Sequence, residues 1–286
     1  MLDAVAAYGP SVLYFVVDGS RRADEVELVS NVKSAVDEFN WQCPVRTLFY
    51  SSNQGAKRAM QGAIDFMFSS ESSGLILEDD CLPSPDFFRF GFEALSMYAD
   101  SPSVGMVSGT NFLGSVRRAD SDVLFSDGHI WGWGTWKDRW EGFRTGTWSL
   151  DRVVKAPSYY GVGWKYRRRL IALAEAGVLD AWDIPWLLSL AERDLWAAIP
   201  VSNLVSNIGH GIAGTHTTGN SRFANLPSRS LPDVVRLQSA VHPDRRYQRR
   251  YSLSLRFEDR LHRVRRPVVS LVRRIIRGTR ARVRPE

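Results

Sequence analysis

Short apolar runs alternate with longer amphipathic stretches over the first 110 residues. The runs have strand length and end at Gly, Ser, Asp or Glu, whereas the stretches between them repeat their apolar side chains at helical spacing. The predicted strands are 11–17, 45–51, 74–78 and 104–109, and the predicted helices are 23–39, 56–68 and 84–99. Repeated strand–helix units of this length predict an α/β fold built on a mostly parallel sheet with flanking helices.

Polar loops follow the first three predicted strands. They read "DGSR" with Asp18, "SSNQG" with Asn53, and "EDDCLPS" from Glu78 onward. Because parallel strands end at the same edge of a sheet, where open α/β sheets bind their ligands, we expect these loops to line one crevice.

Three consecutive carboxylates, Glu78, Asp79 and Asp80, end the third predicted strand. Adjacent carboxylates repel and raise one another's pKa, so a cation or a polar ligand between them is the functional interpretation. The alternative is a solvated loop whose acids favour the start of the next helix, where Ser84 and Pro85 form a typical N-terminus.

The chain becomes aromatic and irregular after residue 110. "HIWGWGTWKDRW" contains Trp131 and Trp133, and "AWDIPW" contains Trp182 and Asp183. We expect these tryptophans to be divided between the core and the wall of a binding site, because aromatic-rich stretches are more often core than not. Asp183 either acts chemically or caps the helix that starts near Pro185.

Composition and charge limit the classes of function. Two cysteines in 286 residues fit a reducing compartment, and no apolar run reaches the roughly 18 residues of a membrane span, so the sequence predicts a cytoplasmic protein. Residues 245–286 contain 15 arginines and three acidic residues, which gives this segment a net charge of +12. Since the whole chain has a net charge of +6, the other 244 residues have a net charge of −6. A basic tail on an acidic body does not favour nucleic-acid binding.

The basic tail, residues 251–286, places Leu, Val and Ile near helical spacing and arginines between them, with an interruption at Pro267. This composition is typical of a helix that lies on an anionic membrane surface. The alternative is a frayed tail without function. The predicted division of the chain is a catalytic domain over 1–225, a linker over 226–250 and this tail.

Collinear motifs resemble a bacterial family of GT-A-fold nucleotide-diphospho-sugar transferases over roughly residues 1–220. They read "LYFVVDGSR", "FNWQCPVRTLFYSSNQGAKRAMQGAIDFMF", "GLILEDDCLPSPDFFRF", "VSGTNF", "HIWGWGTWKDRW", "AWDIPW" and "NLVSNIGHGIAGTHT". The family is distantly similar to the metal-dependent, inverting N-acetylglucosaminyltransferases that begin complex N-glycans. The resemblance implies a GT-A fold, a Rossmann-like sheet, with one departure: the chain starts near a helix, so the family's usual first strand is missing. Either the true start lies upstream, or part of the donor site has been lost.

The resemblance also implies roles for individual residues. Asp80 would bind the metal, Mn²⁺ or Mg²⁺, and His216 in "GTHT" would complete the metal's ligands. Glu78 and Asp79 would meet the ribose of the nucleotide and help to hold the metal through water. Asp183 would be the general base.

Further residues are expected around the donor and the acceptor. Asp18 would face the nucleotide base, and Asn53 would lie in the same crevice. Lys57 and Arg58 either contact phosphate or only begin a helix. The indoles of Trp131, Trp133 and Trp182 would form a wall for sugar rings and exclude water.

The function expected on these grounds is a metal-dependent glycosyltransferase that moves a sugar from a nucleotide-diphospho-sugar to a hydroxyl of a glycan or glycolipid. A divalent ion bound by carboxylates suits the leaving diphosphate, and a carboxylate base suits the attacking hydroxyl. We expect inversion, a role in surface polysaccharide or glycolipid assembly, and attachment to the inner face of the plasma membrane through the tail. The alternative is a non-catalytic GT-A-like protein that binds sugar or partners.

Overall fold

The computed structural model describes residues 1–146, 150–153, 181–209 and 222–255. The strands are β1 (Leu13–Val17), β2 (Val45–Phe49), β3 (Ser73–Ile76), β4 (Cys81–Pro83), β5 (Val104–Ser108), β6 (Val123–Ser126), β7 (Trp133–Trp136), β8 (Trp196–Pro200) and β9 (Val205–Asn207). The helices are α1 (Leu2–Tyr8), η1 (Ala23–Glu25, a 3₁₀ turn), α2 (Val26–Glu38), α3 (Ala56–Phe68), α4 (Pro85–Met97), α5 (Lys137–Thr145), α6 (Leu150–Val153) and α8 (Asp183–Glu192).

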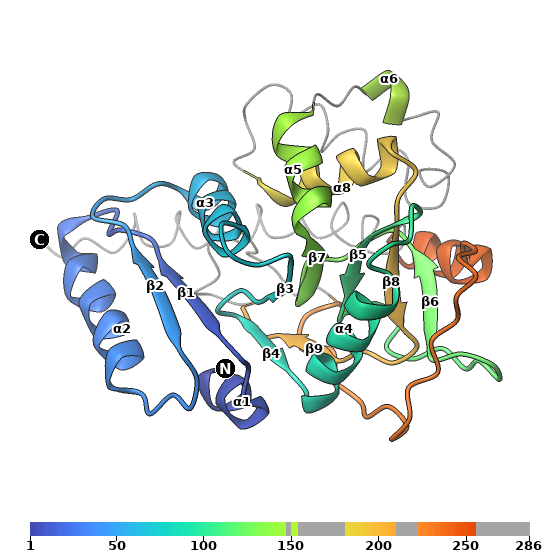
Figure 1. Ribbon diagram of the computed structural model, residues 1–286, viewed down its shortest axis with the longest axis horizontal. Helices are drawn as coiled ribbons and strands as arrows, with labels where there is room; N and C mark the ends of the chain where they lie inside the picture. The colour runs from blue at the N-terminus through green and yellow to red at the C-terminus, as the bar shows by residue number, and fades with distance from the viewer. Residues whose placement is uncertain (147–149, 154–180, 210–221, 256–286) are drawn as a thin grey trace, which may run out of the picture.

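The predicted strand–helix alternation is confirmed up to residue 108, and the sheet is mixed rather than uniformly parallel. Five of the described strands form the central sheet in the order β3-β7-β5-β8-β6, in which β5 and β8 are the one pair of neighbours that is parallel, and β3 runs in the same direction as both. The antiparallel members β6 and β7 come from the aromatic region after residue 110, where alternation of strands and helices stops and gives no signal of strand direction. Figure 1 shows the central sheet with α4 packed along it.

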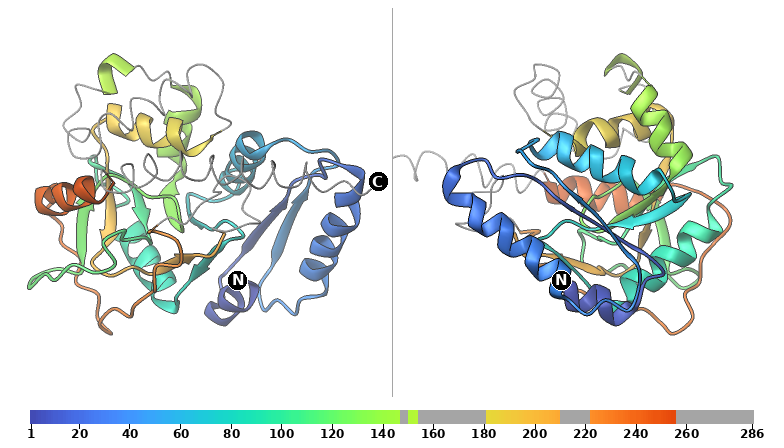
Figure 2. Two further views of the ribbon diagram at one scale, coloured as in Figure 1. Left: turned by 180° about the vertical axis from the view of Figure 1, so that it is seen from behind. Right: turned by 60° about the vertical axis from the view of Figure 1, so that its left-hand side comes forward.

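A second sheet contains only β1 and β2, which pair in parallel from Leu13↔Val45 to Val17↔Phe49. Among the described strands, β1 has no partner on its other edge, and β3 ends the central sheet. Figure 1 and the turned views of Figure 2 show this two-stranded unit, with α2 beside it, set apart from the central sheet. The single sheet expected from the sequence is therefore divided between β1 and β3.

Helix α4 contributes many of its side chains to the hydrophobic core. Phe87, Phe90 and Ala94 are each 0% exposed and recur at helical spacing on the face that packs against β3, β5 and β7. Pro85 begins the helix as expected, but the hydroxyl of Ser84 makes no capping hydrogen bond, and its Oγ is buried without a partner among the described residues. Burial of this aromatic face is the main stabilisation of the helix.

Residues 222–255 pack onto the domain, although 226–250 was expected as a linker. Arg236 binds the Asp122 carboxylate through both its Nε and Nη2, and Leu231 N–H donates to Asp86 Oδ2 at 2.8 Å. Residues 245–255 are helical, and in this helix Tyr247 and Tyr251 are 1% and 6% exposed. Residues 251–255 of the expected tail thus belong to a helix that packs in the core, and residues 256–286 lie outside the described residues. Within the described ranges, no helix is long and apolar enough to cross a membrane.

Candidate functional site

The acidic loop Glu78–Asp80 is held between β3 and β4. Cys81 N–H donates to the Glu78 carbonyl at 3.0 Å, and β4 pairs antiparallel with β9 through Cys81↔Asn207. Ile208 N–H then donates to the Asp80 carbonyl at 2.8 Å. A segment more than a hundred residues away in the sequence thus fixes the backbone of the loop.

The carboxyl group of Glu78 is the most perturbed of the loop. Burial is the largest of the causes that raise the pKa of Glu78 to about 7, and the negative charges of Asp80, Asp183 and Asp79 add to it. A hydrogen bond with the Trp182 indole lowers this pKa by a smaller amount. Its Oε1 atom is buried and makes no hydrogen bond within the described part of the chain. A buried carboxylate oxygen with acidic neighbours and no donor is a place where a cation is strongly favoured.

Asp80 lies against Gly209. A methyl group added to Gly209 would stand 2.7 Å from the Asp80 Cβ and would overlap the carboxylate itself, so only glycine leaves this carboxylate its place. Cys81 beside it is 1% exposed, and burial raises the pKa of its thiol well above the usual range. Cys81 is therefore a neutral packing residue, as its position next to the acids suggests.

Asp18 joins the loops after β1 and β2. Its Oδ1 accepts from the backbone N–H of Gly19 and Gln54, both at 2.8 Å, and its Oδ2 accepts from Asn53 Nδ2 at 2.9 Å and from Gly55 N–H at 3.2 Å. Four donors to one carboxylate hold the two loops together. The sequence predicts Asp18 as a nucleotide contact, and the structure adds this structural role.

Asp183 is the first residue of α8, and Trp182 precedes it. Asp183 and Glu78 line the same cavity, and the negative charge of Asp183 contributes to the raised pKa of Glu78. Trp182 stacks on Trp133 with ring centroids 5.6 Å apart. Trp133 is 0% exposed within β7 and supports Trp182 from behind.

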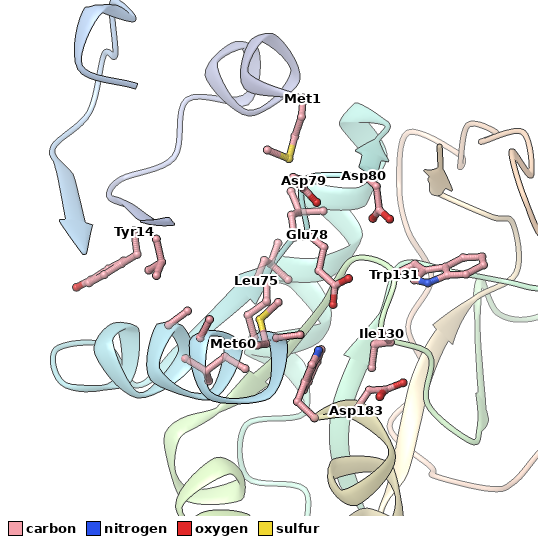
Figure 3. A pocket seen from close by; sticks show the side chains of 18 of the residues that line it. Met1, Tyr14, Met60, Leu75, Glu78, Asp79, Asp80, Ile130, Trp131 and Asp183 are labelled. Carbon is pink, nitrogen blue, oxygen red and sulfur yellow. The ribbon is translucent and has the colours of Figure 1, made fainter. Parts of the chain in front are cut away.

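The carboxylates described above and Trp182 line one cavity of about 2380 Å³. Figure 3 shows Glu78, Asp80 and Asp183 around it, with the indole of Trp131 beside them. Eight of the residues selected from the sequence line this cavity, namely Asp18, Asn53, Glu78, Asp79, Asp80, Trp131, Trp182 and Asp183. The structure thus brings together loops after β1, β2 and β3 with the start of α8, although β1 and β2 belong to a different sheet from β3.

Other selected residues lie elsewhere. Lys57 and Arg58 are exposed in the first turn of α3 and do not line the cavity, and neither does the buried Trp133. His216 falls in 210–221, outside the described residues. Among the residues that are described, no three His, Cys, Asp or Glu side chains form a group that could by itself hold a metal ion.

An aromatic wall that the sequence reasoning missed also lines the cavity. Phe112, His129 and Tyr251 line it together with Trp131, and the ring centroids of Phe112 and His129 are 4.3 Å apart. His129 is only 4% exposed and Tyr251 comes from the helix at 245–255. Phe112 lies within the "VSGTNF" motif, but no local pattern could indicate that a C-terminal helix would pack beside it.

The donor set of the acidic loop fits a hard divalent cation. Oxygen ligands from carboxylates suit Mg²⁺ and Mn²⁺, and the buried Glu78 Oε1 has no hydrogen-bond partner among the described residues. Of the neighbouring carboxylates, Asp80 has the largest effect on the pKa of Glu78.

Comparison with known proteins adds no further assignment. No protein-family model matches this chain, and no curated protein matches it.

Proposed function

We propose that this protein is a metal-dependent glycosyltransferase of GT-A fold that transfers a sugar from a nucleotide-diphospho-sugar to a hydroxyl acceptor with inversion. The observation that carries the proposal is the convergence of Glu78, Asp80 and Asp183 on one cavity beside Trp131 and Trp182. Acidic groups supply the metal site and the base, and indoles suit the apolar faces of sugar rings. The acceptor class is a glycan or glycolipid of a bacterial surface polymer.

The donor lies at the carboxyl ends of β1, β2 and β3. Asp18 and Asn53 order the loops that meet the nucleoside, while Glu78 and Asp79 meet the ribose. The strand-end position favours this arrangement, because backbone amides and loop side chains all point toward the crevice there.

Asp80 and His216, with the diphosphate oxygens, would hold the divalent ion. When bound, such an ion neutralises the charge that develops on the leaving diphosphate. Gly209 keeps the Asp80 carboxylate in place at the point where the chain enters the segment that contains His216.

Asp183 accepts the proton of the attacking hydroxyl. Its place at the start of α8, facing the same space as Glu78, puts it across the cavity from the β3 loop, so the acceptor enters between Asp183 and Trp131. The aromatic wall of Phe112, Trp131 and Tyr251 removes water, the competing nucleophile, from that side.

A screen of nucleotide-sugars by thermal shift, with and without Mn²⁺, tests the proposal. The expected result is a Mn²⁺-dependent rise in melting temperature for one donor in the wild type, which Asp80→Asn abolishes, because ligand that binds only the folded state stabilises it. Glu93→Gln removes a carboxylate from the exposed side of α4 and serves as the matched control. If no donor shifts the wild type more than Asp80→Asn, the proposal fails.

The second candidate is a non-catalytic GT-A-like protein that binds a sugar or a partner. Among the described strands, β1 and β3 each lack a partner on one edge, which favours it, since strand edges without partners beside the donor loops lower the rigidity of these loops. Donor binding without release of nucleoside diphosphate, in the presence of any acceptor extract, would support this candidate over the enzyme.

A further inference from the structure

The helix at 245–255 packs one face into the domain and leaves the other in solvent. On the packed face, Tyr247 and Tyr251 are 1% and 6% exposed, and Tyr251 lines the cavity together with Leu255. The opposite face follows the helical spacing i, i+3, i+4 and i+7. We call it the arginine face, and it consists of four exposed residues, Arg246, Arg249, Arg250 and Leu253.

Contacts with the domain fix the rotation of this helix. Asp244 caps its first turn, because Asp244 Oδ1 accepts from the Tyr247 N–H at 2.8 Å, while Asp244 Oδ2 accepts from Arg118 Nη1 at 2.7 Å. One turn later, Gln248 Nε2 donates to Asp127 Oδ1 at 3.2 Å. These hydrogen bonds and the two buried tyrosines hold one side of the helix, so the arginine face points away from the domain.

The positive charge of the arginine face is not neutralised by its surroundings. No carboxylate that the structure describes forms an ion pair with its three guanidinium groups, whereas Arg118 and Arg236 pair with Asp244 and Asp122. Leu253 lies among the arginines with an exposed fraction of 55%. Guanidinium groups around an exposed aliphatic side chain suit the headgroup region of a bilayer, where arginine binds phosphate and the apolar side chain enters the acyl boundary.

The distribution of charge and the presence of Leu253 favour a membrane over nucleic acid. Residues 1–244 have a net charge of −6, so the basic charge is confined to one end of the chain, and residues 256–286 add 11 arginines directly after the helix. A phosphodiester backbone would engage the arginines but offers no apolar contact to Leu253, whereas a lipid surface satisfies both.

We propose that the arginine face binds the phosphate groups of an anionic membrane surface and thereby orients the folded domain on it. Three arginines are too few to hold the protein on a membrane by themselves, so they act together with the basic tail. The arginine face adds what a tail cannot supply, a contact whose position relative to the cavity is set by the fold.

The orientation has a consequence for the cavity. Tyr251 and Leu255 lie on the other side of the same helix, so the aromatic wall of the cavity stands about 10 Å, one helix diameter, from the phosphate groups. A ligand that carries a lipid anchor can then enter the cavity while its anchor stays in the bilayer. The inference concerns a surface and does not depend on the proposed function.

Sedimentation of the full chain with sucrose-loaded vesicles tests the contact. The vesicles contain phosphatidylcholine and phosphatidylglycerol. Arg246→Gln, Arg249→Gln and Arg250→Gln are combined in one variant. It is expected to partition about a hundredfold more weakly than the wild type, because each arginine near an anionic surface contributes about fivefold, the equivalent of about 1 kcal/mol.

A second triple variant removes the same charge elsewhere. It combines Arg22→Gln, Lys57→Gln and Arg58→Gln, which replace exposed side chains near η1 and in the first turn of α3. The expected loss is less than about fivefold, because charges farther than a Debye length from the membrane are screened. Equal losses in the two variants would overturn the proposal. Weaker binding of single-stranded RNA by the first variant, with unchanged vesicle binding, would assign the arginine face to nucleic acid and overturn it as well.

A fluorescent label at Leu253 gives a readout that does not depend on lost binding. Leu253→Cys is made together with Cys43→Ser and labelled with an environment-sensitive dye, while Cys81, 1% exposed, stays unlabelled. Emission is expected to shift to the blue with phosphatidylglycerol vesicles and to stay unchanged with phosphatidylcholine alone.

Val26→Cys in the same background is the matched control for the label. Val26 is also 55% exposed, and it begins α2, which Figure 1 shows at the opposite end of the molecule from the helix at 245–255. Its dye should not shift. A vesicle-bound protein whose dye at position 253 keeps its emission would show that the arginine face does not touch the membrane and would overturn the proposal. No readout involves a sugar or a nucleotide, so a failure here leaves the proposed function untouched.

Discussion

The carboxylate of Asp80 rests against the backbone of Gly209, where no larger residue fits. The contact joins the acidic loop after β3 to the segment after β9, and the pairing of Cys81 with Asn207 holds both in register. Under the proposed function, this contact sets the position of the metal-binding carboxylate. A glycine far from the acidic motif therefore belongs to the same site.

Gly209→Ala is expected to weaken Mn²⁺-dependent donor binding at least tenfold while changing the melting temperature of the ligand-free protein little. The added methyl group displaces the Asp80 carboxylate, but Gly209 is only half-buried and follows the end of β9. Titration calorimetry with the donor identified by thermal shift measures the effect. Ser206→Ala in the adjoining strand is the control. Equal donor affinities for the wild type and Gly209→Ala would show that the contact between Asp80 and Gly209 does not affect donor binding.

The raised pKa of Glu78 predicts that the free energy of unfolding depends on pH. Its pKa of about 7 in the folded protein exceeds the ordinary 4.5, so the unfolded chain loses this proton first. Between those two values the folded state binds more protons than the unfolded state, and its stability falls as pH rises, by up to about 3 kcal/mol. Below pH 4.5 this penalty is absent.

Glu78→Gln removes the ionisation. Urea unfolding at pH 5 and pH 8 should show a larger loss of unfolding free energy in the wild type than in Glu78→Gln, by about 2–3 kcal/mol. If Mn²⁺ binds the loop, the ion should reduce this loss in the wild type alone. Parallel pH profiles for the two proteins would contradict the electrostatic description of the loop.

Asp183→Asn tests the catalytic role of Asp183. As a general base, Asp183 should contribute about 10²–10⁴-fold to kcat, with donor affinity nearly unchanged. Trp182 and not Asp183 is the N-cap residue of α8, and no side chain makes a capping hydrogen bond there, so the variant is expected to keep the stability of the helix. Transfer rates at saturating donor measure the effect, and a variant with wild-type kcat would show that Asp183 is not the base.

The four hydrogen bonds of the Asp18 carboxylate predict that its removal lowers both the stability of the protein and its binding of the donor. Asp18→Ala leaves the amides of Gln54 and Gly55 and the Asn53 side chain without their common acceptor and should lower the unfolding free energy by about 2–3 kcal/mol. Asn53→Ala removes only one of the four donors and should cost less than half of that. Chemical denaturation ranks the variants, and an Asn53→Ala effect equal to that of Asp18→Ala would show that the side-chain pair alone, and not the amides, joins the loops.

Deletion of residues 256–286 tests membrane attachment. The cut begins there because Tyr251 and Ser254 are buried in the domain, so an earlier cut would damage the core. Deletion is expected to abolish flotation with anionic liposomes, since each basic residue near the surface contributes about 1 kcal/mol, and to leave the melting temperature within a few degrees. Neutral liposomes are the control. Retained flotation would show that the folded domain binds lipid by itself.

The sequence predicted the strands β1, β2, β3 and β5 and the helices α2, α3 and α4 because their apolar patterns are local and their turns are marked by Gly, Ser and Asp, but it did not predict α1 or the short strand β4. It also predicted that the loops after β1, β2 and β3 would lie together, although the structure places β3 in a different sheet from β1 and β2. It did not predict β6, β7 and β8 with their mixed directions, because short buried strands in an aromatic region look alike whichever way they run.

The sequence by itself determined the chemistry available at the sheet edge: Asp18, Asn53, and the acids from Glu78 to Asp80, each at the end of an apolar run. Only the tertiary structure decided that Asp183 shares a space with Glu78, that Gly209 positions Asp80, that Tyr251 joins the aromatic wall, and that β1 and β3 stand apart. Local patterns record the spacing of neighbours along the chain, whereas contacts between distant segments depend on burial and on packing that no single segment contains.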